Sequence, residues 1–177
     1  MLCRLSAAVL LHEGGHLTAA RFLKIPMRRG RGGAFGIRLT FDFSRAGWGR
    51  EAAVHLAGPG AGLLAAFIFR SDPAFSAVNA GLALLNLLPF DGFDGGGALL
   101  CLLLSRTDPA RAARLASWIS AAARGLLWLA AVRLALLPEP DAGLLLFALG
   151  ELCRALPTGG AENAGCVIRQ KTTGKII

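Results

Sequence analysis

The sequence predicts a mainly α-helical, polytopic membrane protein with about four to five transmembrane spans and one small membrane-associated β-strand or hairpin. Of its 177 residues, 54% are hydrophobic and only 17% are charged, and the mean hydropathy is +0.55. A soluble domain carries about 25% charged residues, because it needs a polar surface. The composition therefore excludes a disordered chain and disfavours an ordinary soluble domain.

The first third of the chain predicts a span followed by a β element. Residues 2–23 are apolar and long enough to cross the hydrocarbon core as a helix. Residues 30–33 are rich in glycine and predict a flexible joint. In residues 34–43, large apolar side chains alternate with smaller or polar ones, which is the pattern of a strand or of one arm of a hairpin.

The central apolar runs predict two further spans, residues 52–69 and 74–90. The second of these ends at Pro89 and resumes, after a glycine-rich break, as a continuation within 91–104. Non-helical backbone at membrane depth is tolerated only where protein or a water-filled cavity satisfies its polar groups. The break therefore predicts a helix interrupted near a functional site.

The chain after residue 105 predicts C-terminal helices over 106–156 and a mobile polar tail over 157–177. Apolar runs at 115–137 and 142–156 give the fourth span and a short fifth helix. We therefore expect residues 1–105 to form the functional core.

The charge balance indicates orientation. The chain has 19 basic and 11 acidic residues, a net charge of +8. In so apolar a chain this excess predicts cytoplasmic flanks in contact with anionic lipid, and no nucleic-acid partner. The two basic clusters, residues 28–31 and 106–114, are separated by two predicted spans and so lie on one side, which the positive-inside rule makes cytoplasmic.

The first predicted span contains the motif H-E-x-x-H, residues 12–16. Histidines four residues apart lie on one face of a helix, so His12 and His16 can bind one zinc ion. Glu13 points about 100° away from His12 and can accept a proton from a zinc-activated water without binding the metal. Ionisable groups in a span are costly unless they are paired, liganded or hydrated, which favours a metal site over a solvated turn.

A catalytic zinc usually has three protein ligands. Asp91 and Asp94 in the glycine-rich break are the candidates for the third. His55 lies in the second span, where a lone histidine is more often packed or hydrogen-bonded than a ligand. The glycines of residues 58–62 indicate close helix packing rather than a phosphate loop.

These motifs together resemble the site-2 protease family of intramembrane zinc metalloproteases. Residues 86–96, Asn-Leu-Leu-Pro-Phe-Asp-Gly-Phe-Asp-Gly-Gly, are similar to the family's N-x-x-P-x-x-P-x-D-G-G, and residues 57–59 are similar to its A-G-P segment. The resemblance implies that Asp94 is the third zinc ligand and that Asn86 supports the site. Gly92 stands where the family motif has its second proline, and Gly62 stands where an asparagine is common.

The resemblance also implies a substrate and a location. The strand at 34–43, through Phe35, Gly36 and Ile37, is expected to pair with an unwound segment of a membrane-embedded or membrane-tethered protein. The compact form without a PDZ insertion looks closest to the sporulation-type branch, which processes a pro-sigma factor. We expect a multi-pass protein of a bacterial cytoplasmic membrane, with its site towards the cytoplasm and with regulatory membrane proteins as further partners.

Two other functions stay open at this point. A non-catalytic zinc-binding or structural membrane protein derived from such proteases would have the same motifs. A transporter with a broken helix would use Asp91 and Asp94 to bind ions, but it gives no reason for the H-E-x-x-H motif.

Overall fold

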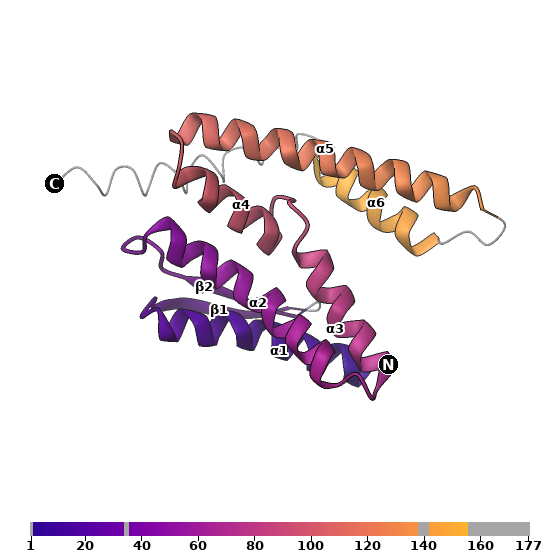
Figure 1. Cartoon of the computed structure of the whole chain (residues 1–177), viewed down its shortest axis with the longest axis horizontal. Helices are drawn as coiled ribbons and strands as arrows, with labels where there is room; N and C mark the ends of the chain where they lie inside the picture. The colour runs from indigo at the N-terminus through magenta and orange to yellow at the C-terminus, as the bar shows by residue number, and fades with distance from the viewer. Residues whose placement is uncertain (1, 34–35, 138–141, 156–177) are drawn as a thin grey trace. The chain divides into compact units, whose positions relative to one another are not determined.

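The computed structural model describes residues 2–33, 36–137 and 142–155. This part of the chain has six helices and two strands, so the mainly helical prediction is confirmed (Figure 1). Contacts divide the chain into two units, Met1–Thr107 and Asp108–Ile177. The elements in order are α1 (Leu2–Phe22), β1 (Met27–Gly33), β2 (Gly36–Phe41), α2 (Trp48–Ile68), α3 (Pro73–Asn86), α4 (Asp94–Leu104), α5 (Pro109–Ala135) and α6 (Ala142–Ala155).

Two of these helices, α2 and α5, are long and apolar enough to cross a membrane. Helix α1 has the length, but His12, Glu13, His16 and its arginines lower its hydropathy. The predicted third span and its broken continuation correspond to two shorter helices, α3 with 14 residues and α4 with 11, separated at the predicted break.

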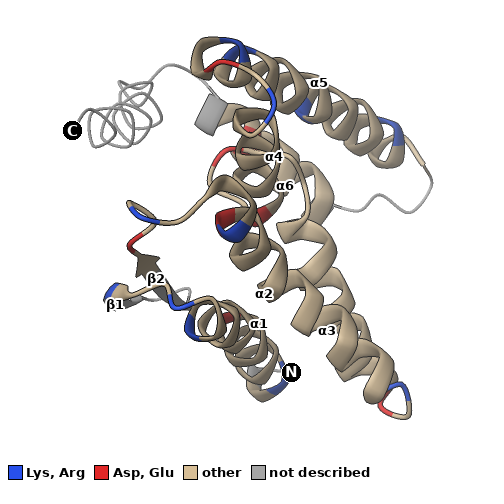
Figure 2. Cartoon of the chain, turned by 60° about the vertical axis from the view of Figure 1, so that its left-hand side comes forward, with Lys and Arg blue, Asp and Glu red and all other residues tan. Residues whose placement is uncertain are grey.

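In α2, α3 and α4, charged residues occur only in the first turn of a helix. Helix α2 has its charges, Arg50 and Glu51, in its first turn, and α3 has none. Helix α4 has only Asp94, at its first residue. Figure 2 shows the resulting long uncharged stretches of α2 and α3.

Helix α2 is the central element of the first unit and contacts α1, α3 and α4, while α1 also contacts α3 and β2. Small residues allow the helices to approach closely, as the sequence predicts. A Cβ on Gly15 would overlap Ala57 and Ala61 of α2, and a Cβ on Gly62 would lie 3.2 Å from the Cβ of Ala83 in α3. Such small-residue contacts allow backbone to approach backbone.

The turn between α2 and α3 is closed by Asp72. Its Oδ1 accepts a hydrogen bond from the backbone N–H of Phe75 at 3.1 Å, and Pro73 occupies the first helical position. Both features favour a helix start here. Arg4 of α1 forms an ion pair with Asp72 at 3.1 Å, which joins the start of the first helix to this turn.

The predicted strand is one arm of an antiparallel hairpin, β1–β2. The prediction of a flexible joint over residues 30–33 is wrong, because these residues belong to β1 and pair with β2. Below the hairpin, Ala20, Ile25 and Val54 form a buried apolar cluster against which Phe41 and Phe43 pack. The hairpin is thereby anchored to α1 and α2.

The break between α3 and α4 depends on glycines. Gly92 has a φ of 90°, a conformation that proline, with its fixed negative φ, cannot adopt. A Cβ on Gly95 would overlap Leu87, and one on Gly96 would overlap Phe90. The glycines therefore allow the first turn of α4 to fold back against the end of α3.

The second unit consists, within the described residues, of α5 packed against α6. Asp108 caps α5 by accepting from the backbone N–H of Arg111 at 3.0 Å. Ser120 of α5 and Glu151 of α6 are buried polar residues at 1% and 2% exposure. The predicted tail over 157–177 lies outside the described residues.

Candidate metal centre

The two histidines of the H-E-x-x-H motif lie one helical turn apart on α1. Both are buried, His12 with 5% and His16 with 7% of its surface exposed. Their rings meet edge to face, with centroids 4.8 Å apart and an angle of 83° between their planes. The i, i+4 spacing therefore brings both imidazoles to one point, as predicted.

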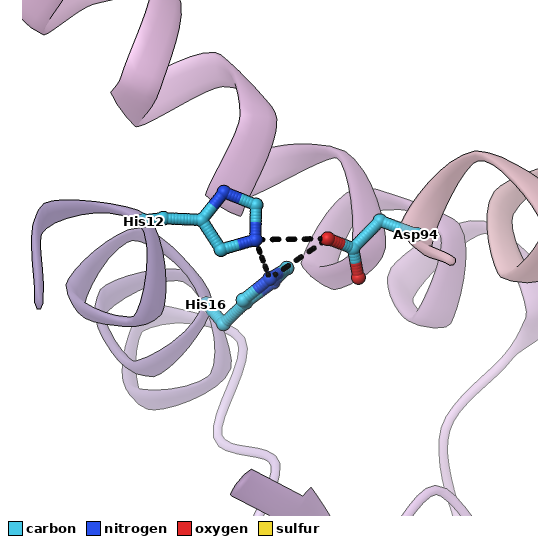
Figure 3. A group of neighbouring side chains, drawn as sticks. All are labelled: His12, His16 and Asp94. Atoms are coloured by element: carbon cyan, nitrogen blue, oxygen red, sulfur yellow. Dashed lines mark hydrogen bonds and ion pairs between the residues drawn. The ribbon is translucent and has the colours of Figure 1, made fainter. Parts of the chain in front are cut away.

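Asp94 reaches the same point from the first residue of α4, where the glycine-dependent break delivers it (Figure 3). Its Oδ2 lies 3.1 Å from His12 Nε2 and 3.2 Å from His16 Nε2, and the two Nε2 atoms are 3.2 Å apart. The three donor atoms therefore form a nearly equilateral triangle.

The triangle has the dimensions of a tetrahedral metal site. Zinc–ligand bonds of about 2.0 Å at tetrahedral angles separate neighbouring donor atoms by about 3.3 Å. Two imidazole nitrogens with a carboxylate oxygen are a ligand set that suits zinc, and three protein ligands leave one coordination position open. The residues therefore fit a catalytic zinc, and no part of this fit depends on the resemblance of the sequence.

His16 is oriented by the backbone of α2. Its Nδ1 donates a hydrogen bond to the carbonyl of Val54 at 2.7 Å, so the neutral ring has its lone pair on Nε2, facing Asp94. Ligating histidines in metalloproteins usually donate their other N–H in this way. The ring lies where a Cβ on Gly58 would be, so the glycine of the A-G-P segment makes room for a ligand. The contact with Val54 had no recognisable signal in the sequence, whereas Gly58 belongs to a glycine-rich run for which close packing was predicted.

His12 is held differently. Its Nδ1 is buried and has no hydrogen-bond partner among the described residues. The ring is therefore positioned by its neighbours in the cluster and by packing, while His16 has a backbone carbonyl as well.

Glu13 follows His12 on α1 and is half-buried. Its carboxylate interacts electrostatically with His16, His12 and Asp94, although it is not one of the three convergent donors. A carboxylate beside a metal centre but outside the ligand set is arranged as a general base requires.

None of the other predicted site residues that the structure describes is among these three convergent donors. Asp91 is exposed, and of the two aspartates in the break it is Asp94 that joins the histidines. Asn86 donates from Nδ2 to the Leu82 carbonyl at 2.9 Å and, among the described residues, forms no hydrogen bond to the three donors. In β2, Gly36 and Ile37 pair with Gly33 and Gly32. Phe35 lies outside the described residues.

A second cluster of metal-binding residue types lies beside the first. One donor atom each of Glu51, His55 and Cys101 lies within 4.8 Å of the others, and His55 Nδ1 is 3.5 Å from Asp94 Oδ1. The sequence favoured His55 as a packed or hydrogen-bonded residue, which agrees with this contact. The proximity of Glu51 and Cys101 to His55 was not anticipated, because no sequence motif relates α2 to α4.

Comparison with solved structures shows that the described fold is similar to that of a site-2 protease. The structure of the site-2 protease from Methanocaldococcus jannaschii is similar with a TM-score of 0.58, over 84% of this chain and 72% of that chain. The two sequences are 18% identical, so the likeness concerns the fold. No family model and no curated protein sequence matches this chain.

Proposed function

We propose that this protein is a zinc-dependent endopeptidase that hydrolyses a peptide bond in or near a transmembrane segment of another protein. The observation that carries the proposal is the triangle of His12, His16 and Asp94, with sides of 3.1–3.2 Å, beside Glu13. The site-2 protease fold supports the same function. Residues 1–105 are the protease core in this proposal.

The mechanism assigns separate tasks to the four residues. His12, His16 and Asp94 hold the ion, and zinc, when bound, polarises the peptide carbonyl and makes water acidic near neutral pH. Glu13 accepts the proton of the attacking water and passes it to the leaving amine. The burial of the two histidines keeps bulk water away from the donors, which strengthens the electrostatic interactions within the site.

The substrate must present an extended segment, because the hydrogen bonds of a helix shield its peptide bonds. The hairpin β1–β2 offers a sheet edge for such a segment, through the backbone of Gly36 and Ile37 and through Phe35. The proposed substrate is a membrane-embedded or membrane-tethered protein, such as a pro-sigma factor or a similar regulator. Regulatory membrane proteins are proposed as further partners.

The membrane placement is supported by the exposed apolar surface of the helices. Large apolar side chains at least 59% exposed include Leu64 and Phe67 on α2, Leu84 on α3 and Leu126 on α5. Burying such surface in lipid is favourable, and the backbone of each helix is satisfied internally. We propose about four to five membrane crossings. The basic flanks and the site would face the cytoplasm of a bacterial cell.

The test is cleavage of a single-span protein by detergent-purified enzyme, with zinc measured in the same samples. Glu13→Gln is expected to retain zinc and to reduce the cleavage rate by at least about 100-fold, the lower end of general-base contributions. Glu151→Gln, which alters a buried carboxyl of the second unit, is the matched control and is expected to cleave normally. Undiminished cleavage by Glu13→Gln would contradict the mechanism, whereas zinc binding with no cleavage by the parent would favour a non-catalytic zinc protein.

A further inference from the structure

The two oxygens of the Asp94 carboxylate face different partners. Oδ2 faces His12 and His16, whereas Oδ1 faces Nδ1 of His55 at 3.5 Å. Asp94 is thus approached from α1 on one side and from α2 on the other. The second side is not used by the mechanism described above.

The His55 ring packs against two neighbours. The ring of Phe43 lies with its centroid 6.0 Å away and 30° between the planes. In α4, a Cβ on Gly97 would come within 2.7 Å of the His55 ring. Gly97 thereby lets the imidazole approach the backbone of the helix that carries Asp94, and Nδ1 lies 3.5 Å from its carboxylate.

In the contact between His55 and Asp94, the chemistry of the two groups determines which one donates the hydrogen bond. An ionised carboxylate only accepts hydrogen bonds, so His55 must have its proton on Nδ1 to interact favourably. The Asp94 side chain is only 17% exposed, and a carboxylate oxygen without a donor is costly there. A donor on Oδ1 also restricts rotation of the carboxylate and keeps Oδ2 turned towards the histidines.

We infer that His55 is a positioning residue that holds Asp94 in its ligating orientation by donating from Nδ1 to Oδ1. This inference rests on the proposed function, since it presupposes a metal at His12, His16 and Asp94. The other use of His55 would be a second metal site with Glu51 and Cys101, whose donor atoms lie within 4.8 Å. The geometry favours positioning, because His55 Nδ1 lies 3.5 Å from Asp94 Oδ1 and the ring packs against Phe43 and Gly97.

Two substitutions separate hydrogen bonding from packing. His55→Asn keeps a donor at the position of Nδ1, because Asn Nδ2 is bonded to Cγ as Nδ1 is, but it removes most of the ring. His55→Phe keeps a ring between Phe43 and Gly97 but has no donor. We expect His55→Phe to weaken zinc binding by about 10- to 100-fold and His55→Asn to bind zinc nearly as tightly as the parent. Zinc affinity is measured by chelator competition on detergent-purified protein.

The controls make each outcome decisive. Phe43→Leu changes the packing of the ring without removing the donor, so it is expected to weaken zinc binding much less than His55→Phe does; circular dichroism checks the folding of every variant. If His55→Phe binds zinc as tightly as the parent, or more tightly than His55→Asn, the positioning role is overturned. Two zinc ions per parent chain, with one lost in Cys101→Ser, would overturn it in favour of a second metal site.

The same measurement distinguishes this inference from the proposed function. If Asp94→Asn leaves zinc affinity unchanged, the metal centre itself is wrong and the role of His55 falls with it. If Asp94→Asn weakens binding but folded His55→Phe does not, only the positioning role is wrong.

Discussion

Both units of the molecule bury polar side chains, but only those of the first converge on one point. His12, His16 and Asp94 come from two helices, and their donor atoms lie 3.1–3.2 Å apart. Ser120 and Glu151 in the second unit are buried more completely, yet no group of metal-binding side chains is found among its described residues. Burial alone therefore does not mark a site; convergence of matched donors does.

The difference has a cause in the backbone. In the first unit, glycines at 58 and 95–97 let ring and backbone atoms approach where side chains would otherwise intervene. In the second, no atom lies within 4 Å of a Cβ built on Gly125 or Gly150. In the first unit, glycines therefore make room for the atoms of the candidate site. Gly125 and Gly150 of the second unit have no such role.

The largest expected effect is on zinc binding, and it is expected only for a substitution in the first unit. Asp94→Asn removes a ligand and is expected to weaken zinc binding by more than about 100-fold, beyond the effect of groups that only orient ligands. Glu151→Gln makes the same chemical change at a buried carboxyl of the second unit and is expected to leave zinc binding unchanged. Equal zinc affinities of the two variants would contradict the inference that the metal-binding residues lie in the first unit only.

A second test concerns the space that glycine provides. In Gly58→Ala the new Cβ would overlap the His16 ring, which must then shift from the Val54 carbonyl. We expect zinc affinity to fall by about 10- to 100-fold. Gly60→Ala on the same helix meets no atom within 4 Å and is expected to keep zinc affinity and to stabilise α2 by about 0.5–1 kcal/mol. Unchanged zinc binding in Gly58→Ala would show that His16 has another way to reach the metal.

A third test compares two serines, one in each unit. Ser76 of α3 donates to the Ala66 carbonyl of α2 at 2.8 Å, whereas Ser120 Oγ is buried without a hydrogen-bond partner among the described residues. Ser76→Ala is expected to lower the free energy of unfolding by about 1 kcal/mol, and Ser120→Ala to leave it unchanged or raise it. Thermal unfolding in detergent measures both. A destabilising Ser120→Ala would mean that its hydroxyl is satisfied after all.

The smallest effect is expected at the hairpin. Hydrogen bonds from Ser44, together with the guanidinium of Arg28 at 2.9 Å, lower the pKa of Asp42 from 3.8 to about 2. A lowered pKa in the folded state stabilises that state above pH 3.8, and this contribution disappears as the pH falls towards 2. Asp42→Asn should therefore be less stable than the parent at pH 6, with a difference that shrinks between pH 4 and 2. A difference independent of pH, measured on zinc-free samples, would argue against this ion pair.

Most of the helices could be predicted from sequence, because apolar runs and their breaks determine where a helix can lie. The second strand was predicted from the alternation of Ile37, Leu39 and Phe41. The first strand was missed because Met27–Gly33 contains three arginines and three glycines and lacks that alternation. Its pairing is set by the partner strand and the core beneath, which local sequence does not reveal.

The candidate metal centre could be predicted only where the spacing of residues in the sequence determines how close their side chains lie. His12 and His16 lie within one helical turn, so their convergence follows from helix geometry alone. Asp94 is 82 residues from His12, and its choice over Asp91 rested on resemblance to a family motif. The contacts of His16 with Val54 and of His55 with Asp94 depend on how α2 packs between α1 and α4, which no spacing in the sequence reports.

The distance along the chain between its ligands gives the centre a second consequence. A metal held by His12 and Asp94 would cross-link the first helix of the unit to the last and close a loop of 82 residues. A metal that binds this site only in the folded state would stabilise that state through its binding free energy, because the unfolded chain does not hold the ligands together. The cross-link cannot form until Asp94 has been synthesised and α4 has reached α1. The stability of this unit would therefore rise with the free zinc concentration and fall when zinc is removed by a chelator.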